Sequence, residues 1–234
     1  GQIRRQRQMC IRDRAKVTAV SRNPQGLLST LEGSDHNAVS LNLEDQKSIL
    51  EFISTIDECH ILINNAAGPP GGPLIENEIE DFIDPFKRHL HASHSLVKGL
   101  IPLMEKSGYG RIVNIISTSV KEPIPNIGLS NTLRGAMASW AKSLSRELPA
   151  CVTINNVLPG FTDTDRLTSL AKSIQEKTGK DIEQIHSGWM DQVPINRLID
   201  PLETGAAIAY LCMPISGGIR GVSLAVDGGR LRSI

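Results

Sequence analysis

The sequence predicts an α/β fold built on a parallel β-sheet. From about Ala15 onward, short β-branched runs alternate with longer stretches of helical spacing, the pattern of parallel strands joined by helical crossovers. The run HILIN at His60–Asn64 has an unbroken apolar centre, as expected for a strand that helices cover on both faces. There is no internal repeat and no linker, so residues 15–234 are expected to form one domain.

Each element follows from apolar periodicity and from the residues that interrupt it. The predicted strands are Lys16–Ser21, Asn37–Leu43, His60–Asn64, Arg111–Ser117, Val152–Leu158 and Val222–Val226. The predicted helices are Glu44–Ile56, Ile79–Lys106, Ser130–Leu148 and Leu202–Met213, with a short helical stretch between the first two strands. Asn42 is placed to cap the first of these helices, and Pro85 is expected to break the second. Asp163–Asp191 is polar with few apolar positions and is predicted to be an exposed helical excursion.

Composition and charge argue against several classes of function. The 25 basic and 25 acidic side chains balance, so no field attracts nucleic acid or anionic lipid, and aromatic content is only 3%. No apolar run approaches the ~20 residues of a membrane helix, and the Arg-rich start lacks the apolar core of a secretory signal. The four cysteines have no metal-binding spacing. We therefore expect a cytoplasmic protein without nucleic-acid partners, membrane attachment or a metal.

Four junctions carry a family resemblance. Asn64–Gly68 (NNAAG), Arg111–Ser117 (RIVNIIS), Asn155–Gly160 (NNVLPG) and Val226–Gly229 (VDGG) resemble, in order and spacing, the motifs of the short-chain dehydrogenase/reductase family. The resemblance spans nearly the whole chain from Ala15. It implies a Rossmann-type, doubly wound parallel sheet that binds its ligands at the carboxyl ends of the strands. It also implies an oxidoreductase that uses NAD or NADP as its cofactor.

The resemblance also implies a set of cofactor-binding residues. Arg22 directly follows a strand at the place where the fold contacts the adenosine ribose. An acidic residue there would bind the 2′-hydroxyl of NAD, whereas an Arg suits the 2′-phosphate, so NADP is favoured over NAD, although Arg22 could equally be a solvated surface residue. The other implied residues are Asn42 and Leu43 at the adenine, Asn65, Ala66, Ala67 and Gly68 in the cleft, Pro159 and Gly160 beside the nicotinamide, and Thr164 near its carboxamide, where Thr162 and Asp163 compete for the role.

The sequence departs from the family pattern at its beginning. Family members begin with a strand and a glycine-rich loop that places the cofactor pyrophosphate at a helix N-terminus. Residues 1–14 (GQIRRQRQMCIRDR) hold one glycine and five arginines. We expect residues 1–14 to be a non-native or disordered basic segment joined to a truncated domain, with the first strand and the Gly-rich loop missing. A basic arm for nucleic acid is the weaker interpretation of this segment. Losing that strand is expected to leave unpaired strand edges.

A second departure concerns the catalytic residues. Family members place a Tyr thirteen residues after the catalytic Ser and a Lys four after the Tyr; the Tyr exchanges a proton with the substrate, and the Lys lowers the pKa of the Tyr. Ser117 matches the Ser, but Ser130 and Arg134 occupy the two other positions. The i, i+4 spacing still puts both on one helical face. The proton could come from Ser130, from a water chain, or from His89, which falls where the family has an Asn on this helix.

The stretch Leu129–Arg134 (LSNTLR) resembles a divergent 3-oxoacyl-carrier-protein reductase-like branch of the family. Two hypotheses follow. One is an oxidoreductase that transfers a hydride to or from a small carbonyl/alcohol substrate, with Ser117 orienting the carbonyl and Arg134 holding the ribose. The other is a catalytically silent dinucleotide-binding homologue that acts as a sensor or oligomer partner. Family members commonly form homo-oligomers, so a tetramer or dimer is expected. Asp163–Asp191 is expected to cover the substrate, with Trp189 and Met190 packing this lid or touching substrate.

Overall fold

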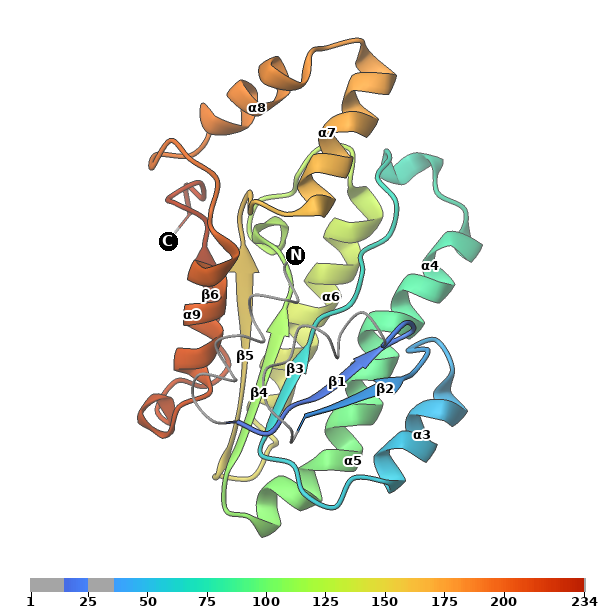
Figure 1. Ribbon diagram of the computed structural model, residues 1–234, viewed down its shortest axis with the longest axis vertical. Coiled ribbons are helices and arrows are strands. Elements are labelled where there is room, and N and C mark those ends of the chain that lie inside the picture. Colours follow the sequence, from blue (N-terminus) through green and yellow to red (C-terminus); the bar gives the residue numbers. More distant parts are fainter. Residues whose placement is uncertain (1–14, 25–35, 234) are drawn as a thin grey trace.

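The computed structural model describes residues 15–24 and 36–233, and its strands lie in two parallel sheets (Figure 1). The smaller sheet pairs β1 with β2, and the larger one has the order β3-β4-β5-β6. The strands are β1 (Thr18–Ser21), β2 (Asn37–Ser40), β3 (Ile61–Asn64), β4 (Gly110–Ile115), β5 (Val152–Pro159) and β6 (Ser223–Val226). All six lie within or overlap the segments predicted as strands, and all pair in parallel, as the alternating pattern of the sequence indicated.

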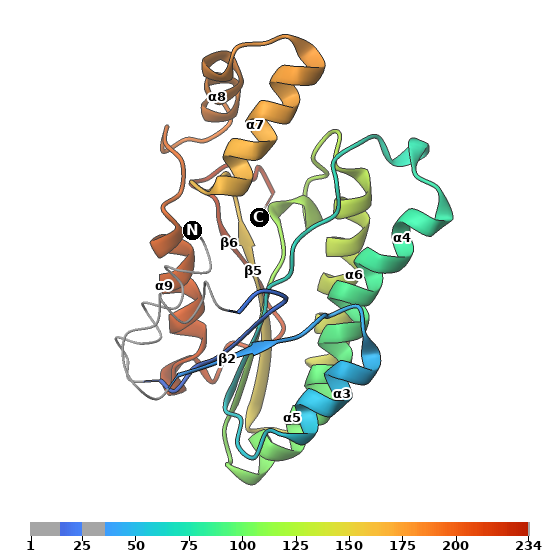
Figure 2. The same cartoon turned by 45° about the vertical axis from the view of Figure 1, so that its right-hand side comes forward.

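Helices cover both faces of the larger sheet (Figure 2). Alternate residues of one strand point to opposite faces. Ile112 of β4 accordingly packs against the face covered by α5 and α6, whereas its neighbour Val113 packs against α9. The helices are α3 (Gln46–Ser54), α4 (Ile79–Phe86), α5 (Ala92–Lys106), α6 (Gly128–Leu144), α7 (Asp165–Thr178), α8 (Ile182–Met190) and α9 (Pro201–Leu211). The doubly wound α/β arrangement is therefore confirmed.

Two local predictions are corrected. Asn42 does not cap α3, because the helix begins at Gln46 and the carboxylate of Asp45 accepts from the Lys47 amide at 3.0 Å. The Asn42 side chain instead accepts from the Glu44 amide at 3.1 Å. An N-cap residue directly precedes the first helical residue. Because α3 begins at Gln46, Asp45 and not Asn42 is its N-cap.

The long predicted helix is not broken at Pro85. Pro85 lies buried inside α4, and the helix continues through a π-helical segment, Lys87–His91, into α5. A proline removes one amide donor from a helix, and a π-helical turn is one way for the chain to absorb such an irregularity without ending the helix. This turn lies beside the candidate site described below, where it determines which side chains point inward.

The two sheets are not hydrogen-bonded to each other within the described residues. β3 pairs only with β4 there, and Ile61 on β3 is 38% exposed. The predictions for residues 1–14 and for the helical stretch between β1 and β2 fall outside the described residues, apart from the first residues after β1.

The excursion after β5 forms a lid beyond the carboxyl ends of the strands (Figures 1 and 2). Helices α7 and α8 share a small core made of Ala171, Ile185 and Trp189, with Met190 packed against it. The Trp189 ring stacks on Phe161 with ring centroids 5.3 Å apart, which joins the lid to the end of β5. Trp189 thus packs the lid onto the domain. In the described part of the chain, no helix combines the length and apolarity needed to cross a bilayer.

Candidate active site

A ladder of amide side chains runs across the larger sheet near the carboxyl ends of its strands. Asn64, Asn114 and Asn156 are in register on β3, β4 and β5, followed by Ser223 on β6. The Asn64 Nδ2 donates to Asn114 Oδ1 at 2.8 Å, Asn114 Nδ2 to Asn156 Oδ1 at 3.0 Å, and Asn156 Nδ2 to the Ser223 hydroxyl at 3.1 Å. Asn114 is fully buried. Each amide satisfies the next, so the edge of the sheet that carries the site is tied together by polar bonds.

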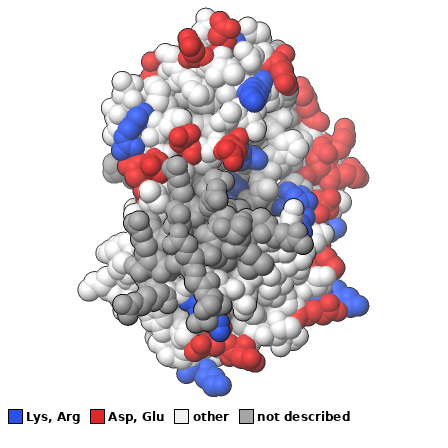
Figure 3. All heavy atoms as spheres, in the orientation of Figure 1, with Lys and Arg blue, Asp and Glu red and all other residues white. Residues whose placement is uncertain are grey.

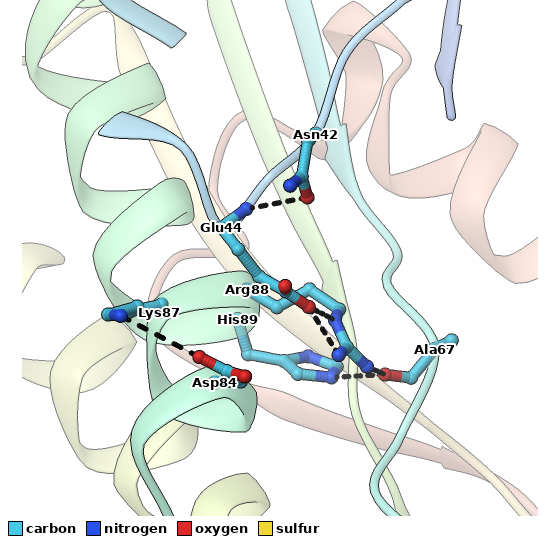
Figure 4. Close-up of polar contacts among 7 residues, drawn as sticks. All are labelled: Asn42, Glu44, Ala67, Asp84, Lys87, Arg88 and His89. Atoms are coloured by element: carbon cyan, nitrogen blue, oxygen red, sulfur yellow. Dashed lines mark hydrogen bonds and ion pairs between the residues drawn. The ribbon is translucent and has the colours of Figure 1, made fainter. Parts of the chain in front are cut away.

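The turn after β3 is held by two consecutive residues of the π-helical segment (Figure 4). The Ala67 carbonyl accepts from His89 Nε2 at 2.9 Å and from Arg88 Nη1 at 3.2 Å. In a regular helix, consecutive side chains point about 100° apart around the axis; here the wider turn brings both to one oxygen. Arg88 also forms an ion pair with Glu44, which follows β2. This network joins the ends of β2 and β3 to α5.

His89 is a poor candidate for the missing proton donor. It is 3% exposed, and burial together with the positive charges of Arg134, Arg88 and Arg166 lowers the pKa of His89 to about 3. The imidazole is therefore neutral at physiological pH, and its Nε2 proton is directed at the Ala67 carbonyl. This geometry indicates a positioning role for His89 in the turn that carries Ala67 and Gly68.

The residues predicted to occupy the catalytic positions lie just after the end of β4 and on α6. The Ser117 hydroxyl accepts from the Ser119 amide at 3.1 Å, which leaves its own proton available to a ligand. Ser130 is partly buried in the first turn of α6, and Arg134 follows it by one turn. Arg134 Nη1 donates to the Ile115 carbonyl at 2.8 Å, at the end of β4.

No phenol is available at this edge of the sheet. The chain has two tyrosines. Tyr109 precedes β4 at its opposite end and donates to the Cys212 carbonyl, and Tyr210 lies near the C-terminal end of α9. Among residues 15–24 and 36–233, no group of His, Cys, Asp or Glu is arranged to hold a metal ion either. The predicted catalytic positions, Ser117, Ser130 and Arg134, therefore offer aliphatic hydroxyls and a guanidinium in place of a phenol.

A cavity of about 20 Å³, room for one water molecule, brings part of the predicted site together. Its walls include Leu43, Asn65, Ala66, His89 and Arg134. Segments that follow β2 and β3 thus meet the last residue of β4, Ile115, as expected for the carboxyl edge of a doubly wound sheet. Arg22 and Asn42 are exposed and do not line this cavity.

The exit of β5 depends on a glycine. A Cβ on Gly160 would lie 2.7 Å from the Asp227 Cα, so only glycine lets the β5 and β6 ends approach this closely. Thr164 is the N-cap of α7: its hydroxyl accepts from the Leu167 amide at 3.3 Å and donates to the Thr162 carbonyl, also at 3.3 Å. Thr162 is buried and donates to the Gly160 carbonyl at 3.1 Å, which gives it a structural role.

Sequence reasoning missed one residue at this edge. Arg166, in the first turn of α7, reaches back to the Pro69 carbonyl with its Nη2 at 3.4 Å. A Cβ on Gly68 would lie 3.2 Å from this nitrogen and 3.6 Å from Arg134 Nη2. The two guanidinium groups therefore converge over Gly68. No local pattern in the sequence distinguishes Arg166 from a solvated lid residue.

The parallel sheet, the crossing of segments at its carboxyl edge and the glycine turn after β3 define the class of nucleotide-dependent α/β enzymes. Comparisons with known proteins give the family. The sequence profile described as enoyl-(acyl carrier protein) reductase matches residues 8–230. The chain is 31% identical over 179 residues to the NADPH-dependent reductase BacG of Bacillus subtilis, covering 74% of this chain and 68% of BacG. It is 30% identical over 219 residues to the 3-oxoacyl-acyl-carrier-protein reductase FabG of Vibrio harveyi, covering 91% and 84%.

The fold agrees with these matches. A crystal structure of YwfH, an NADPH-dependent reductase involved in bacilysin biosynthesis, superposes with a TM-score of 0.90 at 24% identity, covering 99% of this chain and 95% of YwfH. An actinorhodin polyketide ketoreductase with NADPH gives 0.89 at 24% identity, covering 99% and 92%. The chain belongs to the short-chain dehydrogenase/reductase family of NAD(P)-dependent oxidoreductases. None of these matches supports the hypothesis of a catalytically silent homologue.

Proposed function

We propose that this protein is an NADPH-dependent reductase of a small carbonyl compound, and that it works without the Tyr and Lys typical of its family. The carrying observation is that Arg134 lines one cavity with Asn65 and Ala66 of the turn after β3, and that Ser117 follows the same end of β4, while both tyrosines lie elsewhere. The relatives named above include an NADPH-dependent reductase and a 3-oxoacyl reductase, which supports the reaction type.

In this proposal the dinucleotide lies along the carboxyl edge of the sheet and passes the turn after β3, where Gly68 has no side chain. In our proposal, Leu43 and Asn42 border the adenine, Asn65 to Gly68 border the ribose and Gly160 borders the nicotinamide. Arg22 is exposed after β1, where it could reach a 2′-phosphate. Bound there, the cofactor would supply the hydride.

In this proposal, residues just after β4 and on α6 orient the carbonyl and transfer the proton to its oxygen. The Ser117 hydroxyl, which accepts from Ser119, donates to the carbonyl oxygen and so orients it. Ser130 or a water molecule then delivers the proton to the reduced carbonyl oxygen and regains a proton from bulk water; until it does, the charge of Arg134, one turn along α6, stabilises the resulting alkoxide or hydroxide. An aliphatic hydroxyl is a much weaker acid than a phenol, so we expect slow turnover.

Two measurements on the purified protein test the proposal. NADPH binding is followed by titration calorimetry, and NADPH oxidation is followed across a panel of aldehydes, ketones, oxo esters and oxo acids. We expect binding of NADPH in preference to NADH, and turnover of at least one carbonyl that Ser117→Ala abolishes. Binding without turnover of any carbonyl, or turnover that survives in Ser117→Ala, would contradict the proposed mechanism.

We also propose that the protein forms a dimer or tetramer. Apolar side chains are exposed on and before the last strand: Met213 is 42% exposed, Ile215 80%, Val222 38% and Leu224 38%. A neighbouring copy that covers this surface would bury them. Light scattering coupled to gel filtration gives the mass directly, and a monomer at micromolar concentration would refute this part of the proposal.

The balanced charge and the free thiols of Cys59 and Cys151 support the further proposal of a cytoplasmic location. Free thiols persist in a reducing compartment, whereas an oxidising one would favour their pairing. Cell fractionation of the source organism tests this directly, and recovery of the protein outside the cytoplasmic fraction would contradict it.

A further inference from the structure

Two arginines from different layers of the protein meet over one glycine. Arg134 comes from α6, which packs on the sheet, and Arg166 comes from α7, which belongs to the lid. Both Nη2 atoms lie within 3.6 Å of the point where Gly68 would carry a Cβ. The two nitrogens are therefore near neighbours, although like charges repel. Figure 3 shows a few basic side chains below the lid, with acidic side chains near them on the same face.

No carboxylate balances these two charges within the described residues. Arg88, close by, forms an ion pair with Glu44, but neither Arg134 nor Arg166 has an ion pair in residues 15–24 and 36–233. Arg166 also lies in the first turn of α7, where the positive end of the helix dipole disfavours a cation. His89, the remaining titratable group of the cluster, is neutral. Among residues 15–24 and 36–233, therefore, no ion pair offsets the positive charge at the point above Gly68.

The two like charges affect the pKa of Arg134, which is the more buried of the two arginines. Burial and the charge of Arg166 lower the pKa of Arg134 to about 10. An anion between the two groups would offset this repulsion and would raise the pKa of Arg134 back towards its ordinary value. Each still has free donors, because Arg134 uses Nη1 for the Ile115 carbonyl and Arg166 makes only the long contact to Pro69.

We propose that Arg166, with Arg134 beside it, binds a carboxylate on the substrate, so that the protein acts on oxo acids rather than on neutral carbonyl compounds. A planar carboxylate can accept two bonds from one guanidinium, which makes arginine well suited to this role. The position favours the substrate over the cofactor phosphates. The adenosine side of the site follows β1 and β2, on the far side of β3, whereas α6 and α7 border the reacting side, where Ser117 and Ser130 lie.

This inference rests on the proposed reductase function, so its first test is binding, which needs no turnover. Oxalate serves as an unreactive carboxylate probe and oxamide as its neutral counterpart. Both are titrated into the protein with and without NADPH by calorimetry. We expect oxalate, and not oxamide, to bind, and Arg166→Gln to weaken oxalate binding by about tenfold or more, the effect of losing one charge-assisted bond. Lys172→Gln, which removes an exposed cation from the same helix, is the matched control and should leave oxalate binding unchanged.

The kinetic arm compares a 2-oxo acid with its methyl ester. Arg166→Gln should raise KM for the acid about tenfold while leaving KM for the ester and the Kd of NADPH unchanged. If Arg166→Gln weakens NADPH and spares oxalate, the pair serves the cofactor phosphates and the inference is wrong. Equal loss of oxalate binding in Lys172→Gln would show a general charge effect and would also overturn it. Oxalate binding that depends on Arg166, without reduction of any carbonyl, would leave the anion site standing and refute the reductase function alone.

Discussion

Asn114, fully buried near the carboxyl end of β4, donates from its side-chain amide to the side-chain Oδ1 of Asn156, 3.0 Å away. We predict that Asn114→Ala destabilises the protein by about 2–4 kcal/mol, because it leaves the Asn64 amide and the Asn156 carbonyl without partners, and each buried unpaired group costs about 1–3 kcal/mol. Urea unfolding measures this. The control is Asn37→Ala, at an exposed position on β2. If both variants lose the same free energy of unfolding, the buried hydrogen bonds of the ladder do not stabilise the protein.

Two glycine-to-alanine substitutions should change the free energy of unfolding in opposite directions. Gly160→Ala brings a Cβ to 2.7 Å from the Asp227 Cα, so the backbone must move, and we expect a loss of about 1–3 kcal/mol in the free energy of unfolding. Gly135→Ala, within α6, meets no atom within 4 Å. It should stabilise the protein by roughly 0.5–1 kcal/mol through helix propensity. Thermal unfolding that ranks the two variants in the reverse order would contradict the close approach of β5 and β6.

His89 should make stability depend on pH. Its pKa falls from 6.5 to about 3 in the fold, so between these values the unfolded chain takes up a proton that the folded protein refuses. The stability that the fold gains from a neutral His89 is complete above pH 6.5. As the pH falls towards 3, this part of the free energy of unfolding is lost, by an amount on the order of a few kcal/mol. His89→Asn should therefore flatten the fall in unfolding free energy across this window. His91→Asn, at an exposed position of the same turn, should keep the wild-type slope.

Ser130 can be tested against its neighbour on α6. If it delivers the proton, Ser130→Ala should lower kcat about 100-fold and leave the Kd of NADPH unchanged, because general acids contribute effects of that size. Thr132→Ala is the control, since the Thr132 hydroxyl is exposed and bonds only to the Gly128 carbonyl of its own helix. Steady-state kinetics with the best carbonyl substrate gives both constants. An unchanged kcat in Ser130→Ala would assign the proton to water.

Much of the fold was predictable because its signals are local. Apolar runs such as HILIN, and the turns that follow them, identify the strands from a few neighbouring residues. The same holds for the family motifs, which lie at strand ends in a constant order. The predictions that failed were finer: the cap moved from Asn42 to Asp45, and Pro85 did not break its helix, because each depends on where a helix starts or how its turns adjust.

By itself, therefore, the sequence determined the α/β class, the parallel pairing of the strands and the family. The catalytic departure at Ser117, Ser130 and Arg134 stays a prediction from the sequence. Only the tertiary structure decided that Arg88 and His89 share the Ala67 carbonyl, that three asparagines form one ladder, and that Arg166 meets Arg134 over Gly68. The physical reason is that these contacts join residues far apart in the chain. Strand register and helix packing place them, and neither leaves a periodic trace in the sequence.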